Sequence, residues 1–285
     1  MEIIRDPNLL QQKMLALRQT GKQIGLVPTM GFLHEGHLSL IRAARSQCDV
    51  LVVSIFVNPT QFGPNEDLNA YPRDFESDEQ RCKEEGTDIV FYPSAQSMYS
   101  EKSSVWVNET ILSHGLCGAS RSGHFRGVCT VVAKLFNLVQ PSVAVFGEKD
   151  AQQLRIIEQM VRDLFFPIKI IRAPLVREPD GLAMSSRNKY LSKEERNAAL
   201  CLQSALHLAT NLFENGERST AVLREAITLE IKKTALAKID YIEIVDDQKL
   251  TSVEEIKSPV LIALAVKFGK TRLIDNQYLF FNSFE

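Results

Sequence analysis

The sequence lacks the features that mark membrane-spanning, secreted and nucleic-acid-binding proteins. No apolar run approaches the roughly 20 residues that a membrane-spanning helix needs, and residues 1–6 show neither the basic nor the apolar segment of a signal peptide. The formal net charge is −2, so no basic excess is available to bind a polyanion. We therefore expect a cytoplasmic protein with neither a membrane nor a nucleic-acid partner.

Cysteine is also scarce and scattered. The chain has five, an odd number, and none of them forms a C-x-x-C pair: Cys48, Cys82, Cys117, Cys129 and Cys201. Their spacing favours neither a disulfide framework nor a zinc site, and scattered thiols suit a reducing compartment. We interpret all five as core or surface residues.

Residues that can build a core are plentiful. Hydrophobic residues make up 45% and charged residues 24% of the 285 positions, which is the balance of a globular protein with room for two domains. The first two-thirds of the chain alternates short apolar runs, which we predict to be strands (24–27, 50–57, 89–92, 143–146 and 168–173), with helical patterns (38–45, 75–85, 128–138 and 151–164). This alternation predicts an α/β fold with a Rossmann-like, doubly wound parallel sheet.

The pattern changes after Val176. Ser192 and Glu195 form a capping box that predicts one long helix ending at Phe213. A second helix (220–233) and three strands (241–245, 260–266 and 271–275) follow, the last two joined by a hairpin turn at 269–270. We therefore predict a Rossmann-like domain over residues 1–176 and a smaller α+β domain over residues 177–285.

Two histidines flank a glycine where the first strand of the predicted sheet leads into its first helix. They are His34 and His37 around Gly36, with Gly31 upstream. Open α/β sheets bind ligands at this edge, and the N–H groups of a helix N-terminus there attract phosphates. A lone histidine is more often structural, but the H-x-G-H spacing in this setting favours a nucleotide site. Because no G-x-x-x-x-G-K-[ST] occurs, the site is not a Walker loop.

A second candidate segment is Met184-Ser185-Ser186-Arg187, in a loop after Pro179-Asp180-Gly181. Two hydroxyls and a guanidinium suit the β- and γ-phosphates of ATP. By itself the tetrapeptide would be read as a solvated loop. Together with H-x-G-H, it indicates ATP binding.

The third candidate segment, Gly147-Glu148-Lys149-Asp150, again follows a predicted strand. Lys149 can serve a phosphate as a point charge. Asp150 either caps the next helix or binds a ligand, and the sequence leaves both interpretations open. Gln153, three residues further on, is expected to share its face of that helix.

The fourth candidate segment follows the second strand and carries two amides, Asn58 and Gln61. Paired donor and acceptor contacts from such amides can hold a hydroxy acid. An Asx-turn before Pro59 is the structural alternative, which suits Asn58 well and Gln61 poorly.

On the basis of these motifs, the chain resembles the pantoate–β-alanine ligase (pantothenate synthetase) family over about residues 24–191, and the C-terminal domain is consistent with the same family. Four segments carry the resemblance: PTMGFLHEGHLSLI, VSIFVNPTQFGPNEDLNAYPRD, VFGEKDAQQLRII and REPDGLAMSSRN. More distantly, H-x-G-H and M-S-S-R resemble the HIGH and KMSKS signatures of class I aminoacyl-tRNA synthetases and related nucleotidylyltransferases.

The resemblance implies a two-step reaction that makes the coenzyme A precursor pantothenate. The carboxylate of (R)-pantoate attacks the α-phosphorus of ATP, which gives pantoyl adenylate and pyrophosphate. The amine of β-alanine then displaces AMP. A protein assists such chemistry mainly by positioning the reactants and neutralising charge.

The resemblance also implies roles for residues that match the family motifs. His37 corresponds to the proton donor, and His34, Lys149, Ser185, Ser186 and Arg187 are expected to act with it. Gln61, Gln153 and Asn58 are expected at pantoate, and Gln61 also at β-alanine. Residues expected to contact ATP are Met30, Gly31, His34, Gly36, His37, Gly147, Glu148, Lys149, Asp150, Val176, Met184, Ser185, Ser186 and Arg187.

Further expectations concern cofactor, assembly and motion. Mg²⁺ is expected to accompany ATP, held mainly by phosphates and not by a protein metal site. The resemblance also implies a homodimer. On separate grounds, residues 177–285 are expected to act as a lid that carries the 184–187 loop, because this loop lies just past the boundary near Val176 and is flanked by Pro179 and Gly181. The alternative is a fixed loop. The chain departs from the family pattern at one position, where Ser122 replaces the common proline. Serine leaves the backbone before His124 less rigid than proline would.

Two rival functions are less consistent with the sequence. A nucleotidyltransferase that acts on a phosphorylated substrate would need further Arg or Lys beside Gln61, where this chain has amides and aromatic residues. A non-catalytic, RNA-binding relative of a synthetase would need a basic appendage, which the net charge of −2 disfavours.

Overall fold

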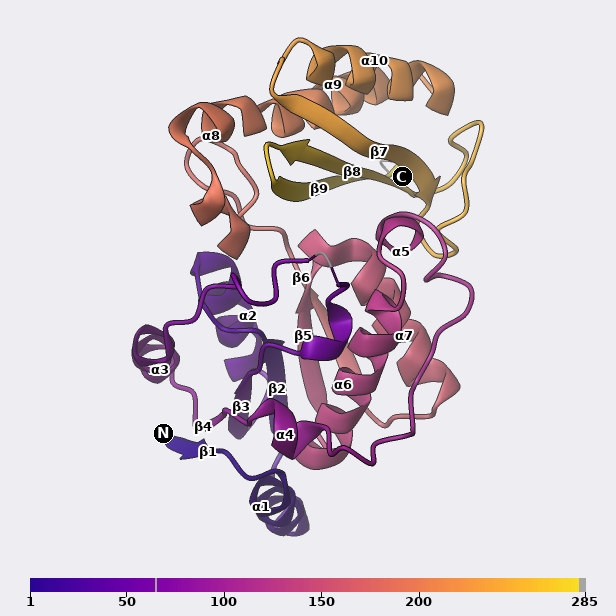
Figure 1. Ribbon diagram of the computed structural model, residues 1–285. Helices are drawn as coiled ribbons and strands as arrows, with labels where there is room; N and C mark the ends of the chain where they lie inside the picture. Colours follow the sequence, from indigo (N-terminus) through magenta and orange to yellow (C-terminus); the bar gives the residue numbers. More distant parts are fainter. Residues whose placement is uncertain (65, 282–285) are drawn as a thin grey trace. The chain divides into compact units, whose positions relative to one another are not determined.

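The computed structural model describes residues 1–64 and 66–281 (Figure 1). The chain folds into two compact units. Unit 1 comprises Met1–Ser113, Ser120–Glu148 and Gln153–Leu175, and unit 2 comprises His114–Ala119, Lys149–Gln152 and Val176–Glu285. Within the described residues, no helix is both long enough and apolar enough to cross a membrane.

Unit 1 is built on a six-stranded parallel sheet, which confirms the predicted fold class. The spatial order is β1 (Glu2–Ile4), β4 (Ile89–Phe91), β3 (Val50–Ile55), β2 (Ile24–Thr29), β5 (Val143–Gly147) and β6 (Lys169–Ala173). The chain runs outward from β2 through β3 to β4 and then returns to β5 on the other side of β2. The switch point therefore lies between β2 and β5, where such sheets bind ligands beyond the carboxyl ends of the strands.

Helices cover both faces of this sheet. They are α1 (Pro7–Gln19), α2 (Glu35–Arg45), α3 (Phe75–Glu84), α4 (Ala95–Met98), α6 (His124–Val139) and α7 (Ala151–Asp163). Val145 on β5 packs in one core cluster with Ile41 of α2, whereas its neighbour Phe146 meets the ring of Phe136 on α6. Since successive strand residues point to opposite faces, α2 and α6 cover opposite sides of the sheet.

Unit 2 contains a three-stranded antiparallel sheet in the order β7 (Ala237–Asp246), β8 (Val260–Phe268) and β9 (Thr271–Leu279). The helices α8 (Lys193–Ala199), α9 (Cys201–Glu214) and α10 (Thr220–Lys232) accompany it, with α9 and α10 on one side of the sheet in Figure 1. Ile262 and Leu264 of β8 join the core shared with these helices. The predicted hairpin turn is confirmed: Gly269 has φ +56°, and β9 begins two residues later.

The opposite face of the unit 2 sheet is covered by two segments from much earlier in the sequence, His114–Ala119 and Lys149–Gln152. Leu116 and Ala151 pack with Leu261 and Ala263 of β8. Gln152 reinforces this contact, because its Nε2 donates to Gly115 O at 2.7 Å and its Oε1 accepts from Cys117 N at 3.0 Å. Residue 117 begins the short helix α5 (Cys117–Ser120). The sequence had not indicated that these two segments belong with unit 2.

Several boundaries differ from the sequence-based expectations. The single helix predicted to end at Phe213 is two helices that meet at Leu200, whose φ of −63° and ψ of −19° remain helical. The first predicted strand does not stop at Pro28 but continues to Thr29. Because β2 pairs with β5 only at Gly25 and Leu26, one side of the strand is unpaired at Pro28 and the missing N–H is tolerated. The strand β1 and the helices α1, α4 and α5 were not predicted.

Candidate active site

The turn from β2 into α2 is a constrained piece of backbone. Gly31 has φ +81° and Phe32 has φ +52°, so two successive residues adopt left-handed conformations. Thr29 supports the turn, because its Oγ1 donates to Ser54 O on β3 at 2.8 Å and accepts from Gly31 N at 3.1 Å. A non-glycine residue with positive φ is uncommon and indicates that the surroundings hold the turn in place.

This turn brings the two predicted histidines together at the start of α2. His34 is the N-cap residue of the helix, and the two ring centroids lie 4.1 Å apart. The backbone N–H of His34 donates to Nδ1 of His37 at 3.3 Å. Because Nδ1 accepts that bond, the neutral His37 ring carries its proton on Nε2. His37 can therefore donate from Nε2 to an anion at the helix N-terminus, where the macrodipole favours negative charge.

A buried carboxylate from α3 holds the same turn, and the sequence analysis missed it. Asp78 is 2% exposed, and its oxygens accept from Phe32 N and Leu33 N at 2.7 Å each. Burial raises the pKa of Asp78 above the ordinary carboxyl value, and the two N–H donors offset only part of that rise. The 45- and 46-residue separations left no local signal for this contact.

We expect Asp78→Ala to lower the free energy of unfolding by about 2 to 5 kcal/mol, because two N–H groups at a strained turn lose their acceptor. Denaturation in urea, followed by circular dichroism, measures the change. Gln80→Ala, at an exposed position on the same helix, is the matched control and should cost less than about 0.5 kcal/mol. Equal losses in the two variants would mean that Asp78 does not hold the turn.

The predicted amides lie beyond β3 and contact each other. Gln61 lies in the short 3₁₀ helix η1 (Pro59–Gln61) and is 8% exposed. Asn58 is 1% exposed, and its Nδ2 donates to Gln61 Oε1 at 3.0 Å and to Gly127 O at 3.2 Å. Gln61 Nε2 in turn donates to Met30 Sδ at 3.2 Å. Since the Asn58 amide is occupied inside the protein, we expect it to affect a ligand through Gln61.

The residues after β5 include a cation, Lys149, that is paired with its neighbour Asp150. Lys149 Nζ lies 3.7 Å from Asp150 Oδ2, and the Asp150 side chain is 50% exposed. Lys149 is anchored within unit 2, because Asn276 Nδ2 donates to its carbonyl at 2.9 Å. Gln153 is partly exposed on the first turn of α7. Gly147 and Glu148 precede this group at the end of β5.

The Met184–Arg187 segment is part of a hydrogen-bonded structure within unit 2. Met184 N donates to Val176 O at 3.0 Å, which places these two predicted ATP contacts side by side. Arg187 N donates to Ser185 Oγ at 3.2 Å, and Ser186 is buried in the 3₁₀ helix η3 (Ser186–Tyr190). The loop is therefore ordered by its own hydrogen bonds.

Two arginines hold the base of that loop through three ion pairs. Arg177 makes a bidentate pair with Asp275 of β9, at 2.7 and 2.9 Å. Arg196 of α8 donates to Glu178 at 2.6 Å and to Asp180 at 2.7 Å. The Asp275 side chain is 1% exposed, so water weakens its pair with Arg177 little.

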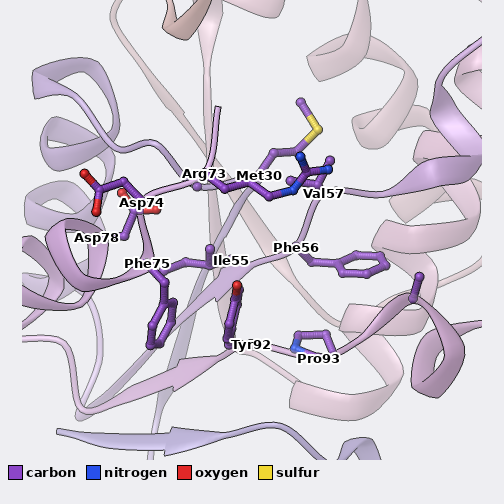
Figure 2. Close-up of a pocket in the computed structure, with 12 residues that line it drawn as sticks. Met30, Ile55, Phe56, Val57, Arg73, Asp74, Phe75, Asp78, Tyr92 and Pro93 are labelled. Atoms are coloured by element: carbon purple, nitrogen blue, oxygen red, sulfur yellow. The ribbon is translucent and has the colours of Figure 1, made fainter. Parts of the chain in front are cut away.

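A pocket of about 220 Å³ opens beside Met30 at the carboxyl ends of β2, β3 and β4 (Figure 2). Its lining includes Arg73, Phe75, Asp78 and Tyr92, none of which was singled out from the sequence. Phe75 and Tyr92 stack with their centroids 4.0 Å apart. The position of Tyr92 directly after β4 was the available signal, because the switch-point rule marks every strand end on this edge. The pocket offers an apolar wall, a guanidinium and carboxylates to a small polar ligand.

Among residues 1–64 and 66–281, no group of three or more His, Cys, Asp and Glu side chains is arranged to hold a metal ion. The anion-binding features are instead cationic or dipolar: the α2 N-terminus, Lys149 and Arg187. The first lies in unit 1 and the two cations lie in unit 2, and each by itself suits a phosphate group.

Comparison with known proteins gives a consistent picture. A family model described as pantoate–β-alanine ligase matches residues 2–278. A pantothenate synthetase from Thermotoga neapolitana is 57% identical over 263 residues, which cover 92% of this chain and 94% of the relative. One from Moorella thermoacetica is 55% identical over 279 residues, which cover 98% and 99% of the two chains.

Solved structures with the same fold agree. A pantothenate synthetase from Thermus thermophilus superposes with a TM-score of 0.92 at 42% identity, covering 97% of this chain and 99% of the other. A pantoate–β-alanine ligase from Francisella tularensis, complexed with β-γ ATP and β-alanine, gives 0.81 at 36% identity, covering 97% of each chain.

Proposed function

This chain belongs to the pantoate–β-alanine ligase family, and from that premise we propose how its residues join pantoate to β-alanine at the expense of ATP. The pantoate carboxylate attacks the α-phosphorus of ATP and releases pyrophosphate, and the amine of β-alanine then displaces AMP from pantoyl adenylate. The family match over residues 2–278 is the observation that carries this conclusion. ATP and pantoate should release one equivalent of pyrophosphate per site, and continuous release should require β-alanine.

We propose that the α2 N-terminus binds the ATP phosphates. His37 donates from Nε2 to the phosphate charge that develops on attack, and His34 holds Nδ1 of His37 through its backbone N–H. Met30, Gly31 and Gly36 give the nucleotide access to this backbone. Lys149 and Arg187 neutralise the charge of the outgoing pyrophosphate, and the Ser185 and Ser186 hydroxyls donate hydrogen bonds to it. The remaining ATP contacts are Gly147, Glu148, Asp150, Val176 and Met184.

We propose that Gln61 and Gln153 bind pantoate and that Gln61 also faces β-alanine. Asn58 supports this site by holding Gln61 Oε1. With its oxygen held, the Gln61 amide can swing its NH₂ group from Met30 Sδ to a substrate oxygen at little cost, because a thioether is a weak acceptor.

Mg²⁺ is proposed to accompany ATP. The donor chemistry fits, because Asp150 offers one half-exposed carboxylate beside Lys149. One carboxylate is enough for an ion that keeps several waters and takes its other ligands from phosphates. Bound there, the ion would neutralise phosphate charge.

We further propose that residues 177–285 act as a lid over the domain formed by residues 1–176. Since the Met184–Arg187 segment is tied within unit 2 by the Arg177–Asp275 pair, the lid is expected to move as a body and not by ordering of the loop. Closure would exclude water that could hydrolyse the acyl adenylate. On the basis of the family resemblance, we also propose that the protein functions as a homodimer in the cytoplasm.

If residues 177–285 close as a lid, the protein should become more compact when it binds nucleotide, and this change should depend on Arg187. A non-hydrolysable ATP analogue should lower the radius of gyration of the wild type in small-angle X-ray scattering. Arg187→Ala should remove most of this change, and slow adenylate formation about tenfold or more, because a charge-assisted bond to phosphate is lost. Lys189→Ala, an exposed cation in the same loop, is the control and should compact normally. A radius that does not change with nucleotide in the wild type would favour the fixed-loop alternative.

A further inference from the structure

The segment Arg121-Ser122-Gly123-His124 forms a tight turn just before α6. His124 N donates to Arg121 O at 3.1 Å, and Gly123 has φ +77° at the N-cap of the helix. The left-handed glycine turns the chain back on itself. As a result, the side chains of Arg121 and His124 meet, although Ser122 replaces the proline that would have stiffened this backbone.

Arg121 directs its three guanidinium nitrogens at three partners: Glu66, His124 and, at 3.5 Å from Nη2, the carbonyl oxygen of Gln61. Nε and Nη2 donate to the two carboxylate oxygens of Glu66 at 2.8 and 2.6 Å. Nη1 lies 2.9 Å from Nε2 of His124. Burial pushes the pKa of Glu66 up, but the hydrogen bonds and charge of Arg121 outweigh it and hold that pKa below the ordinary value. Glu66 therefore stays ionised at neutral pH and keeps Arg121 in place.

These contacts determine the tautomer of His124. A guanidinium can only donate, so Nε2 of His124 must accept and the ring proton must be on Nδ1. Nδ1 lies 2.8 Å from the backbone oxygen of Gln61. The bond thus runs in one direction, from the imidazole N–H to the carbonyl of Gln61. His124 is 8% exposed, so water competes weakly for this bond.

The short segment that contains Gln61, residues 58–61, packs closely against α6. A Cβ atom on Gly127 would lie 2.4 Å from Thr60 O and 2.7 Å from Gln61 N, which is closer than real atoms approach. Asn58 also crosses this contact through its bond to Gly127 O. The backbone of Gln61 is therefore held by α6 through close packing as well as through His124.

We propose that Glu66, Arg121 and His124 form a positioning chain that fixes the carbonyl of Gln61 and so aims its side-chain amide at pantoate. The inference rests on the proposed role of Gln61 in binding pantoate. His124 does not touch the substrate in this scheme. It acts on the affinity for pantoate because an amide that is misplaced by a fraction of an ångström loses much of its hydrogen bond.

Two amide substitutions at residue 124 separate the two ring nitrogens. Asparagine places an N–H donor near the position of Nδ1, whereas glutamine places its amide near that of Nε2. We expect His124→Gln to raise the KM for pantoate about tenfold, and His124→Asn to stay within about threefold of the wild type, since only asparagine keeps the bond to the Gln61 carbonyl. The KM for ATP should move less than twofold in both variants.

A double-mutant cycle tests whether His124 acts through Gln61. In a Gln61→Ala background there is no side-chain amide to misplace, so adding His124→Gln should raise the KM for pantoate no further. Three results would each overturn the positioning chain. The effects of Gln61→Ala and His124→Gln on the KM for pantoate could multiply, asparagine and glutamine at residue 124 could have equal effects, or the KM for ATP could rise as much as the KM for pantoate. If Gln61→Ala alone leaves the KM for pantoate unchanged, the proposed role of Gln61 fails instead.

Discussion

Replacement of His37 by alanine should slow adenylate formation by about 10² to 10³, the loss seen when one donor to a developing oxyanion is removed. The donor at risk is Nε2–H, because Nδ1 accepts from His34 N at 3.3 Å. The residue lies in the first turn of α2 and is only partly buried, so its removal should leave the unfolding free energy nearly unchanged. Single-turnover release of pyrophosphate from ATP and pantoate measures the rate.

Amide substitutions sharpen the test of His37. Glutamine places its amide near the Nε2 position and should recover part of the rate, whereas asparagine should recover little. This order is the reverse of the one expected at His124, where the functional donor is Nδ1. His207→Ala, at an exposed histidine on α9, is the matched control and should not alter the rate. Near-normal pyrophosphate release by His37→Ala would rule out its proposed role.

The second large effect that we expect is a selective loss of affinity for one ligand in each of two variants. Gln61→Ala should weaken pantoate binding about 10- to 100-fold and ATP binding little, whereas Lys149→Ala should do the reverse. The reason is that Gln61 offers a neutral amide suited to a hydroxy acid, and Lys149 offers a point charge suited to phosphate. Isothermal titration of each variant with each ligand measures the four dissociation constants.

A third variant serves as the control for this comparison. Thr60→Ala removes the Oγ1 donor to Asn58 Oδ1, next to Gln61, but leaves both proposed ligand contacts in place. It should bind both ligands within a few-fold of the wild type. Comparable losses of pantoate and ATP in both Gln61→Ala and Lys149→Ala would indicate general damage to the site, and would contradict the assignment.

The central sheet was predictable because its inner strands β2, β3 and β5 are nearly continuous apolar runs with helical patterns between them. In the parallel sheet of unit 1, burial on both faces removes the need for polar residues, so Val50–Ile55 is recognisable from its composition alone. The three-residue strand β1 was missed because an edge strand of that length has no such pattern. The break at Leu200 was missed because residues on both sides of it are good helix formers.

The candidate site divides in the same way. His34, Gly36 and His37 could be proposed as site residues because they are close in sequence and lie at a strand-to-helix junction, so their chemistry could be inferred locally. Gln61 could be proposed because its amide follows a strand. Their supports could not, since Asp78 reaches Leu33 across 45 residues and His124 reaches Gln61 across 63. A spacing rule does not detect contacts of that length.

The sequence by itself determined the α/β class, the change of character after Val176 and the residues expected to meet ATP and pantoate. It did so because apolar periodicity and turn chemistry act over a few residues. Only the tertiary structure decided which nitrogen of His37 and of His124 carries the proton, because each tautomer depends on what the folded backbone or Arg121 presents to the other nitrogen. It also decided that Leu116 and Ala151 complete the core of unit 2, because the exposed face of an antiparallel sheet can be covered by any apolar segment that the fold brings to it.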